Sequence, residues 1–359
     1  MTDDIKPIIA NVHEHDFHPL DDRAFTIDRH LNTAGIADRN DRDWYVRTRA
    51  VRDLVRAGDD DRAAIRAALE DTDPHARTVA AHALGVLGDP GAVTDLERVA
   101  RSDESAVARS RAVVSLGQLA RPRSAPTLET VATSDPSRDV RHQASLASHR
   151  VETNQPATHA LEDAWRTLEL VDRRPVTGDV APSFSLSDAF GTEHSIEDIR
   201  GDGWAVLIWI FADWCPVCHG EFAELLEHEN AFATADVRVA TIECHDAYRC
   251  RAMLGTEAAP EYWFDATPRN PDEIWWPHLV DRAAAVGTQY GVDPHAFAVH
   301  AEYVNRPATV IVDPDGVIRF NYTGTFWGDR PSIPETLSMI EEESFEFEHP
   351  DRLVPEEGC

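Results

Sequence analysis

A period of 32 residues runs through the first half of this 359-residue chain. Three segments starting near residues 73, 105 and 137 align, each with a polar turn followed by small and apolar side chains at helical spacing. A weaker copy begins at Trp44. A repeat of this length is one supersecondary unit that cannot bury its apolar face alone, so neighbouring copies must stack. The recurring residues are Asp71, Asp103 and Asp135 in the turns, and Arg77, Arg109 and Arg141 in the helices that follow.

Each unit is predicted to be a helix, a turn and a second helix, punctuated by segments such as Gly88-Asp89-Pro90. The pattern resembles short HEAT-type repeats, which implies an all-α solenoid that binds a protein partner along its concave face. The recurring arginines either line up inside the stack of helices as a hydrogen-bonded ladder or mark a face that contacts a partner. We favour the ladder, because these positions follow the turn between repeats and can bond to the carbonyl groups of the preceding repeat.

The charge balance is strongly acidic, with 34 basic and 64 acidic side chains and a formal net charge of −30. This argues against nucleic acid or an anionic membrane as the main partner, because both require a basic surface. No apolar run approaches the roughly 20 residues of a membrane span, and the N-terminus lacks secretory features, so we expect a cytoplasmic protein. Lys6 is the sole lysine. This composition resembles that of haloarchaeal proteins, and a GC-rich genome is the alternative explanation.

The two halves of the chain differ in charge. Residues 1–150 hold 21 basic and 25 acidic side chains, whereas residues 151–359 hold 13 and 39. We therefore predict a polar N-terminal segment (1–43), HEAT-like helical repeats (44–155), a second domain (174–343) and an acidic tail (344–359). The near-neutral repeats either dock an acidic partner or pack against the acidic domain of the same chain. Within the first segment, His13 to His18 are interpreted as a solvated polar stretch, with a metal site as the alternative.

The chemistry is predicted to lie in the second half. Residues 205–211 form a continuous apolar run, typical of a strand buried on both faces of an α/β sheet. The run ends at Trp214-Cys215-Pro216-Val217-Cys218, and a helical pattern follows. A cysteine at a helix N-terminus has its thiolate stabilised by unpaired N–H groups, and Pro216 loses no hydrogen bond there. We expect Cys215 to be the attacking thiol, more exposed and more acidic than the resolving Cys218.

A strand, a Cys-x-x-Cys motif and a helix in this order resemble the thioredoxin superfamily, in particular its AhpC/TSA and TlpA/ResA-like redoxins. Further matches are Gly178-x-x-Ala181-Pro182-x-Phe184, Glu221 three residues after the second cysteine, and Arg306-Pro307-Ala308-Thr309. The resemblance implies an α/β thioredoxin-like fold over residues 174–343, with Cys215, Cys218, Glu221 and Pro307 at the site and Trp214 and Pro216 as accessory residues. Pro307 matches the cis-proline of the family, which faces the dithiol. No cofactor and no metal centre are assigned.

Some residues depart from the family pattern or leave alternatives open. Peroxiredoxins have a threonine three residues before the reactive cysteine, but here Ala212 and Cys215 occupy those positions. Arg306 is either an active-site residue or a surface residue. Cys244 and Cys250 are a second dithiol, two ordinary thiols, or part of a metal site with His219 or His245. Cys359 is either a mobile thiol or a dispensable tail residue.

The preferred function is a thiol-disulfide oxidoreductase whose helical repeats select a protein client. The alternatives are a peroxiredoxin-type thiol peroxidase, which would act as an antioxidant, and a redox-sensing adaptor. The substrate is expected to be a protein disulfide, a small disulfide or a peroxide. The aromatic stretch 251–305 is predicted to include a helix over about residues 276–290, with the remainder forming a substrate wall or an enlarged core.

Overall fold

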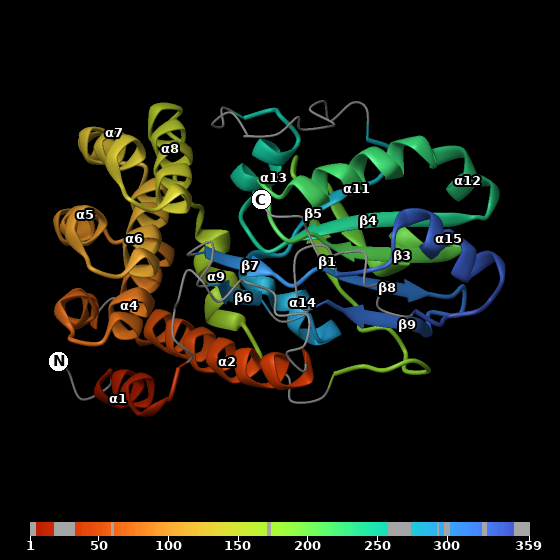
Figure 1. Ribbon diagram of the computed structural model, residues 1–359, viewed down its shortest axis with the longest axis horizontal. Helices are drawn as coiled ribbons and strands as arrows, with labels where there is room; N and C mark the ends of the chain where they lie inside the picture. The colour runs from red at the N-terminus through yellow and green to blue at the C-terminus, as the bar shows by residue number, and fades with distance from the viewer. Residues whose placement is uncertain are drawn as a thin grey trace. The chain divides into compact units, whose positions relative to one another are not determined.

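The computed structural model describes residues 5–17, 33–58, 61–170, 174–257, 274–292, 294–297, 302–324 and 329–347 (Figure 1). The chain divides into two compact units. The first comprises residues 1–169, 258–260 and 295–303, and the second comprises the remainder. No helix in the described segments is long and apolar enough to cross a membrane.

The first unit is a series of antiparallel helices. Ile5, just before the first helix, and Ile9 and Val12 within it are buried, so part of the segment expected to be polar contributes to an apolar core. The helices are α1 (Lys6–Glu14), α2 (Thr33–Ala57), α3 (Arg62–Ala67), α4 (Pro74–Val86), α5 (Val93–Ser102), α6 (Ala106–Leu119), α7 (Ala125–Ser134), α8 (Arg138–Glu152) and α9 (His159–Thr167). Helices α4, α6 and α8 lie side by side at 32-residue intervals, as the repeat predicts.

Polar turns set the start of each of these three helices. Asp71, Asp103 and Asp135 each accept the backbone N–H two residues further on, at 2.8–2.9 Å. The N-cap side chains that follow are Asp73, Ser105 and Ser137, and each accepts a backbone N–H of the first turn. These caps satisfy donors that a helix start otherwise leaves unpaired.

The recurring arginines form a ladder. Arg77 donates through Nε and Nη2 to the two carboxylate oxygens of Asp103, at 2.7 and 2.8 Å. Its Nη1 donates to the carbonyl groups of Asp71 and Thr72 in the turn before its own helix. Each rung therefore joins one turn to the next.

Arg109 repeats the arrangement one unit later. It donates to both carboxylate oxygens of Asp135, at 2.7 and 3.0 Å, and to two carbonyl groups of the preceding turn. Arg141 donates to the carbonyl groups of Asp135 and Pro136. The predicted ladder is confirmed. The ion pair to the following turn is an addition that the sequence analysis did not foresee.

We expect Asp135→Asn to lower the free energy of unfolding by about 1.5–3 kcal/mol, the usual worth of a buried hydrogen bond to a charged group. The amide keeps the shape of the side chain but loses the charge that Arg109 faces. Urea titration followed by circular dichroism measures the change. Glu104→Gln is the matched control, because the Glu104 side chain is 84% exposed beside the same ladder. Equal losses in the two variants would contradict a structural role for the ladder.

A five-stranded mixed sheet forms the centre of the second unit. Its strand order is β5 (His278–Val280), β4 (Val237–Glu243), β3 (Trp204–Trp209), β8 (Ala308–Val312) and β9 (Ile318–Thr323). Strands β3, β4 and β5 are parallel, and β8 is antiparallel to both β3 and β9. A small antiparallel pair accompanies it, formed by β1 (Ser185–Ser187) and β2 (Glu193–Ser195). A separate two-stranded sheet consists of β6 (Pro294–Phe297) and β7 (Glu302–Asn305), and most of its residues belong to the first unit.

Helices cover both faces of this sheet. They are α10 (Ile196–Arg200), α11 (Pro216–Glu227), α12 (Glu229–Thr234), α13 (Ala247–Met253), α14 (Ala285–Tyr290) and α15 (Ile333–Glu341). Leu207 and Trp209 of β3 share one core with Ile199 of α10 and Tyr290 of α14. Alternation along the strand directs Val206 and Ile208 to the opposite face. Both sets are buried, which explains the continuous apolar run.

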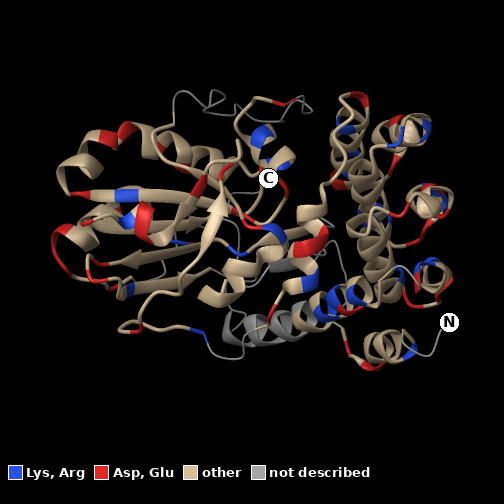
Figure 2. Ribbon diagram, turned by 180° about the vertical axis from the view of Figure 1, so that it is seen from behind, with Lys and Arg blue, Asp and Glu red and all other residues tan. Residues whose placement is uncertain are grey.

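The predicted helix over about residues 276–290 is wrong in its first half. Residues 278–280 form β5, which pairs in parallel with β4, and a helix starts only at Ala285. Ala283 and Ala284 have positive φ values of 63° and 53°, so the chain cannot run helically across them. In Figure 2 red acidic bands predominate over this unit, whereas blue and red bands mix over the helices of the first.

Candidate functional site

Strand register brings the chemistry-bearing segments to one end of the sheet. Trp209, the last residue of β3, pairs with Ile242 near the end of β4 and with Ala308 at the start of β8. The loop after β3, the segment after β4 and Pro307 before β8 therefore emerge at the same edge. Cys244 directly follows β4, so it lies at this same edge of the sheet.

The dithiol occupies the first turn of α11. Cys215 is the N-cap residue, Pro216 opens the helix, and Cys218 lies one turn further on. Both thiols are buried, with residue exposures of 1% and 0%. The expected difference in exposure between Cys215 and Cys218 is therefore only one per cent.

Donors converge on Cys218. Its Sγ accepts the backbone N–H of Phe211 at 3.3 Å, and Nη2 of Arg330 lies 3.7 Å from it. The same guanidinium donates to both carboxylate oxygens of Glu221, at 2.7 and 2.5 Å. Arg330 and Glu221 are 4% and 8% exposed, so this ion pair is largely removed from water.

These contacts place the negative charge of the dithiol on Cys218. Burial alone would raise the pKa of this thiol, but the hydrogen bond from Cys215 and the charge of Arg330 bring it to about 7. Burial and the hydrogen bond to Cys218 raise the pKa of Cys215 well above its usual range. The position of Arg330 beside Cys218 thus favours Cys218, and not the expected Cys215, as the more acidic thiol.

Arg330 is the residue that the sequence analysis missed. It precedes α15, far from the dithiol in the chain, and the analysis assigned no role to it. Helix α15 packs on α11, and this contact brings the guanidinium to Cys218. The only signal in the sequence was a lone basic residue just before a helix, which carries no information about its partner.

The remaining residues of the predicted motif are packed around the dithiol. Trp214 is 5% exposed and lies edge-on to Phe211, with ring centroids 5.7 Å apart. Asp213 is fully buried and forms an ion pair with Arg249 of α13, whose Nε donates at 3.0 Å. His219 places Nε2 2.7 Å from the carbonyl oxygen of Asp213.

Pro307 and Arg306 precede β8 at this edge of the sheet. Both are buried, and Arg306 is only 4% exposed, so the surface interpretation of Arg306 is wrong. The carbonyl group of Pro307 accepts the N–H of Gly324 at 2.7 Å.

The other cysteines are only partly described. Cys244 and Cys250 are buried, and neither forms a disulfide in the structure. Cys359 lies outside the described residues.

The N-terminal histidine stretch was expected to be solvated. In its described part, His13 pairs with Asp71 at 2.9 Å and Phe17 stacks on the His75 ring, so this part packs against the helical repeats.

Comparison with known families divides the chain in two. Residues 177–321 match the AhpC/TSA family, and residues 36–117 match HEAT repeats. The chain thus contains an AhpC/TSA redoxin domain preceded by HEAT repeats, and it has homologues in the thioredoxin superfamily. The predicted fold class, an all-α HEAT-like solenoid followed by an α/β thioredoxin-like fold, is confirmed.

Curated relatives include both reductases and a peroxiredoxin. The thiol-disulfide oxidoreductase ResA of Geobacillus thermodenitrificans is 26% identical over 163 residues, which is 45% of this chain and 77% of the relative. The 1-Cys peroxiredoxin PER1 of Zea mays is 25% identical over 146 residues, 40% of this chain and 63% of the relative. The thiol:disulfide interchange protein DsbE of Haemophilus influenzae is 26% identical over 149 residues, 42% and 67%.

Solved structures with similarity to the chain include peroxidoxin BcpB from Mycobacterium tuberculosis. It shares 19% identity with a TM-score of 0.38, and the match covers 46% of this chain and 96% of BcpB. The reduced 2-Cys peroxiredoxin of Plasmodium vivax shares 18% identity with a TM-score of 0.38, covering 47% and 96%.

Proposed function

We propose that this chain, with an AhpC/TSA redoxin domain at residues 177–321, is a cytoplasmic thiol-disulfide oxidoreductase acting through Cys215 and Cys218. The observation that carries the proposal is a paired dithiol on the first turn of α11, with one sulfur held beside a buried guanidinium. A thiolate is the form that attacks disulfides, and a cation beside it keeps it populated near neutral pH.

The two cysteines have different roles in this proposal. In the reduced protein the Cys215 thiol donates a hydrogen bond to the Cys218 thiolate. Transfer of that proton to Cys218 leaves Cys215 as the thiolate, which attacks a substrate disulfide RS–SR. A Cys215–S–S–R bond forms, and the released RS⁻ takes the proton from Cys218.

Resolution completes the two-electron transfer. The Cys218 thiolate attacks Sγ of Cys215, the Cys215–Cys218 disulfide forms, and the second RS⁻ leaves and takes a proton from water. The dithiol is oxidised and the substrate disulfide is reduced to two thiols. Arg330 favours the anionic form of Cys218 in this second step, in which the Cys218 thiolate attacks.

Glu221, Pro307, Trp214 and Pro216 support this chemistry. Glu221 holds Arg330 in place through two hydrogen bonds. Pro216 starts the helix whose N-terminus faces the dithiol, and Trp214 packs over the loop. Pro307 shares the sheet edge with the dithiol, and the family resemblance makes it a substrate-facing residue.

The HEAT repeats are proposed to select a protein client. Their recurring arginines are engaged in the ladder, so recognition is left to other side chains, among them the exposed Arg123 and Arg138. These side chains are 60% and 47% exposed, and an acidic client surface would complement them.

A peroxiredoxin-type thiol peroxidase is the second candidate. One observation favours it: the Phe211 N–H and the Arg330 guanidinium both meet the same sulfur, that of Cys218. Such a sulfur could attack hydrogen peroxide, forming sulfenic acid and releasing water. The threonine of the peroxiredoxin motif is replaced by Cys215, which removes a donor for the peroxide oxygen.

We expect the reduced protein to react with a small disulfide at least about ten-fold faster than with hydrogen peroxide, because peroxide attack needs a prearranged set of donors. Stopped-flow tryptophan fluorescence gives both rate constants on the same sample. Mass spectrometry after dimedone treatment reports sulfenic acid at Cys218. A peroxide rate constant above the disulfide rate constant, with dimedone on Cys218, would make the peroxidase the preferred function.

A further inference from the structure

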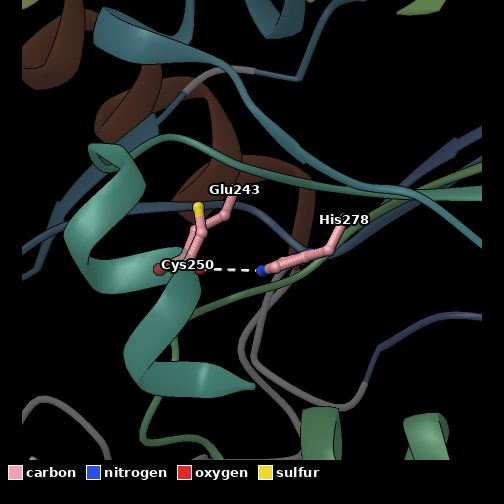
Figure 3. Close-up of side chains that lie close together, drawn as sticks. All are labelled: Glu243, Cys250 and His278. Carbon is pink, nitrogen blue, oxygen red and sulfur yellow. Dashed lines mark hydrogen bonds and ion pairs between the residues drawn. The ribbon is translucent and has the colours of Figure 1, made fainter. Parts of the chain in front are cut away.

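A second group of reactive side chains lies at the same end of the sheet and takes no part in the dithiol chemistry above. Glu243 ends β4, Cys250 belongs to α13 and His278 opens β5. Their exposures are 0%, 0% and 1%. One donor atom from each lies within 4.8 Å of the others (Figure 3).

The buried carboxylate is surrounded by ligand-type groups. Glu243 Oε2 lies 3.2 Å from Nε2 of His278, and Oε1 lies 2.5 Å from Nδ1 of His245. In Figure 3 the His278 ring points at Glu243, with Cys250 beside the carboxylate. Burying a carboxylate is costly unless a cation or strong donors compensate it, and neutral imidazoles provide only hydrogen bonds.

The imidazole of His278 is held in a fixed orientation. Its Nδ1 lies 2.9 Å from Oγ1 of Thr241, and that hydroxyl also accepts Nε1–H of Trp276 at 3.1 Å. When Nδ1 carries the proton and donates it to Thr241, Nε2 presents a lone pair toward Glu243. The Nε2 lone pair and the carboxylate of Glu243 would then repel each other, and a cation bound between them removes this repulsion. Proteins commonly orient a histidine metal ligand by a hydrogen bond to the ring nitrogen that does not bind the metal, and Thr241 provides such a partner for Nδ1 of His278.

We propose that Glu243, Cys250 and His278 bind a divalent transition-metal ion of the zinc class. Sulfur, imidazole nitrogen and carboxylate oxygen together form a donor set that suits Zn²⁺. Tetrahedral bonds of about 2.0–2.3 Å place donor atoms roughly 3.5 Å apart, so the observed spacing closes with small side-chain movements.

The ion would connect three elements of the redoxin domain. It would link the end of β4 to the start of β5 and to α13, which carries Arg249, the partner of Asp213 in the dithiol loop. The three ligands are at most 1% exposed, so a substrate cannot reach the ion and its role would be structural. Its ligands are separate from Cys215 and Cys218, so the proposal stands independently of the reductase function.

The test uses the full-length chain, stripped with chelator under reducing conditions and titrated with Co²⁺ or Zn²⁺. We expect one Co²⁺ per chain, with tetrahedral visible bands and a sulfur-to-cobalt charge-transfer band. Cys250→Ser should lose the charge-transfer band, whereas Cys244→Ser, a neighbouring buried thiol, should keep it. Thr241→Val should weaken Zn²⁺ affinity by about 10–100-fold, the usual cost of losing a partner that orients a ligand.

Melting curves with and without Zn²⁺ cover the case in which a variant is unstable. Zn²⁺ should raise the melting temperature of the wild type and of Cys244→Ser, but not of Cys250→Ser. A wild-type protein that binds no Co²⁺, or binds it without a charge-transfer band, overturns the proposal. A band that survives Cys250→Ser or disappears in Cys244→Ser overturns it equally.

Discussion

A Cys215→Ser variant is expected to lose reduction of small and protein disulfides by about 10⁴-fold or more, as enzymes do when the nucleophile of a concerted unit is removed. The hydroxyl can still donate to Cys218, but it cannot form a mixed disulfide. Insulin reduction with a chemical reductant as electron source measures the loss. Cys244→Ser is the control, because that buried thiol lies at the same end of the sheet, and it should retain the wild-type rate.

In the partner variant Cys218→Ser, the reaction is expected to stop after the mixed disulfide at Cys215 has formed. It lacks the resolving thiol, so the mixed disulfide at Cys215 should accumulate and carry the client with it. Peptide mapping by mass spectrometry locates the bond, and the trapped proteins identify the clients. Mixed disulfides at Cys218 in the Cys215→Ser variant, with full turnover, would reverse the roles of the two cysteines.

Arg330→Gln is expected to raise the pH at which the dithiol ionises by one unit or more from about 7. The guanidinium favours the thiolate, so its removal raises the pKa, and the alkylation rate at pH 7 should fall about ten-fold for each unit. Ultraviolet absorbance of the thiolate across a pH series measures the midpoint. Arg319→Gln is the matched control, since Arg319 is 42% exposed and pairs with Asp313.

Glu221→Gln should move the midpoint in the opposite direction, because the Glu221 carboxylate raises the pKa of Cys218. Each single variant leaves one buried charge unpaired and should cost about 3–5 kcal/mol of stability. The double variant Glu221→Gln/Arg330→Gln removes both charges and should recover much of that loss. Shifts of the same sign in both single variants would show that altered packing, and not charge, controls the dithiol.

Local patterns in the sequence were sufficient for the parts of the fold that depend on near neighbours. The 32-residue period predicted the helical stack. The recurrence of an arginine after each turn, at Arg77, Arg109 and Arg141, predicted the ladder. The apolar run 205–211 followed by two cysteines predicted a buried strand leading into α11. In each case the signal lies within one or two adjacent elements of secondary structure.

The parts that were missed depend on contacts between distant segments. Arg330 meets Cys218 across 112 residues, and the contact exists only because α15 packs on α11. His278 meets Glu243 because β5 pairs with β4. The helix expected near residue 276 reflects the same difficulty, since a three-residue strand is recognisable only from the neighbour that it pairs with.

The ladder also has a consequence for how the helical stack comes apart. Arg77 and Arg109 each bind the carboxylate of the following turn, whereas Arg141, within the described residues, donates only to carbonyl groups of its own turn. In an array of repeats, stability is the sum of each unit and its interfaces with neighbours. The repeat that contains α8 lacks an ion pair to a following turn, so thermal unfolding is expected to start there. The repeats joined by the Arg77 and Arg109 ion pairs are expected to unfold together as one cooperative unit.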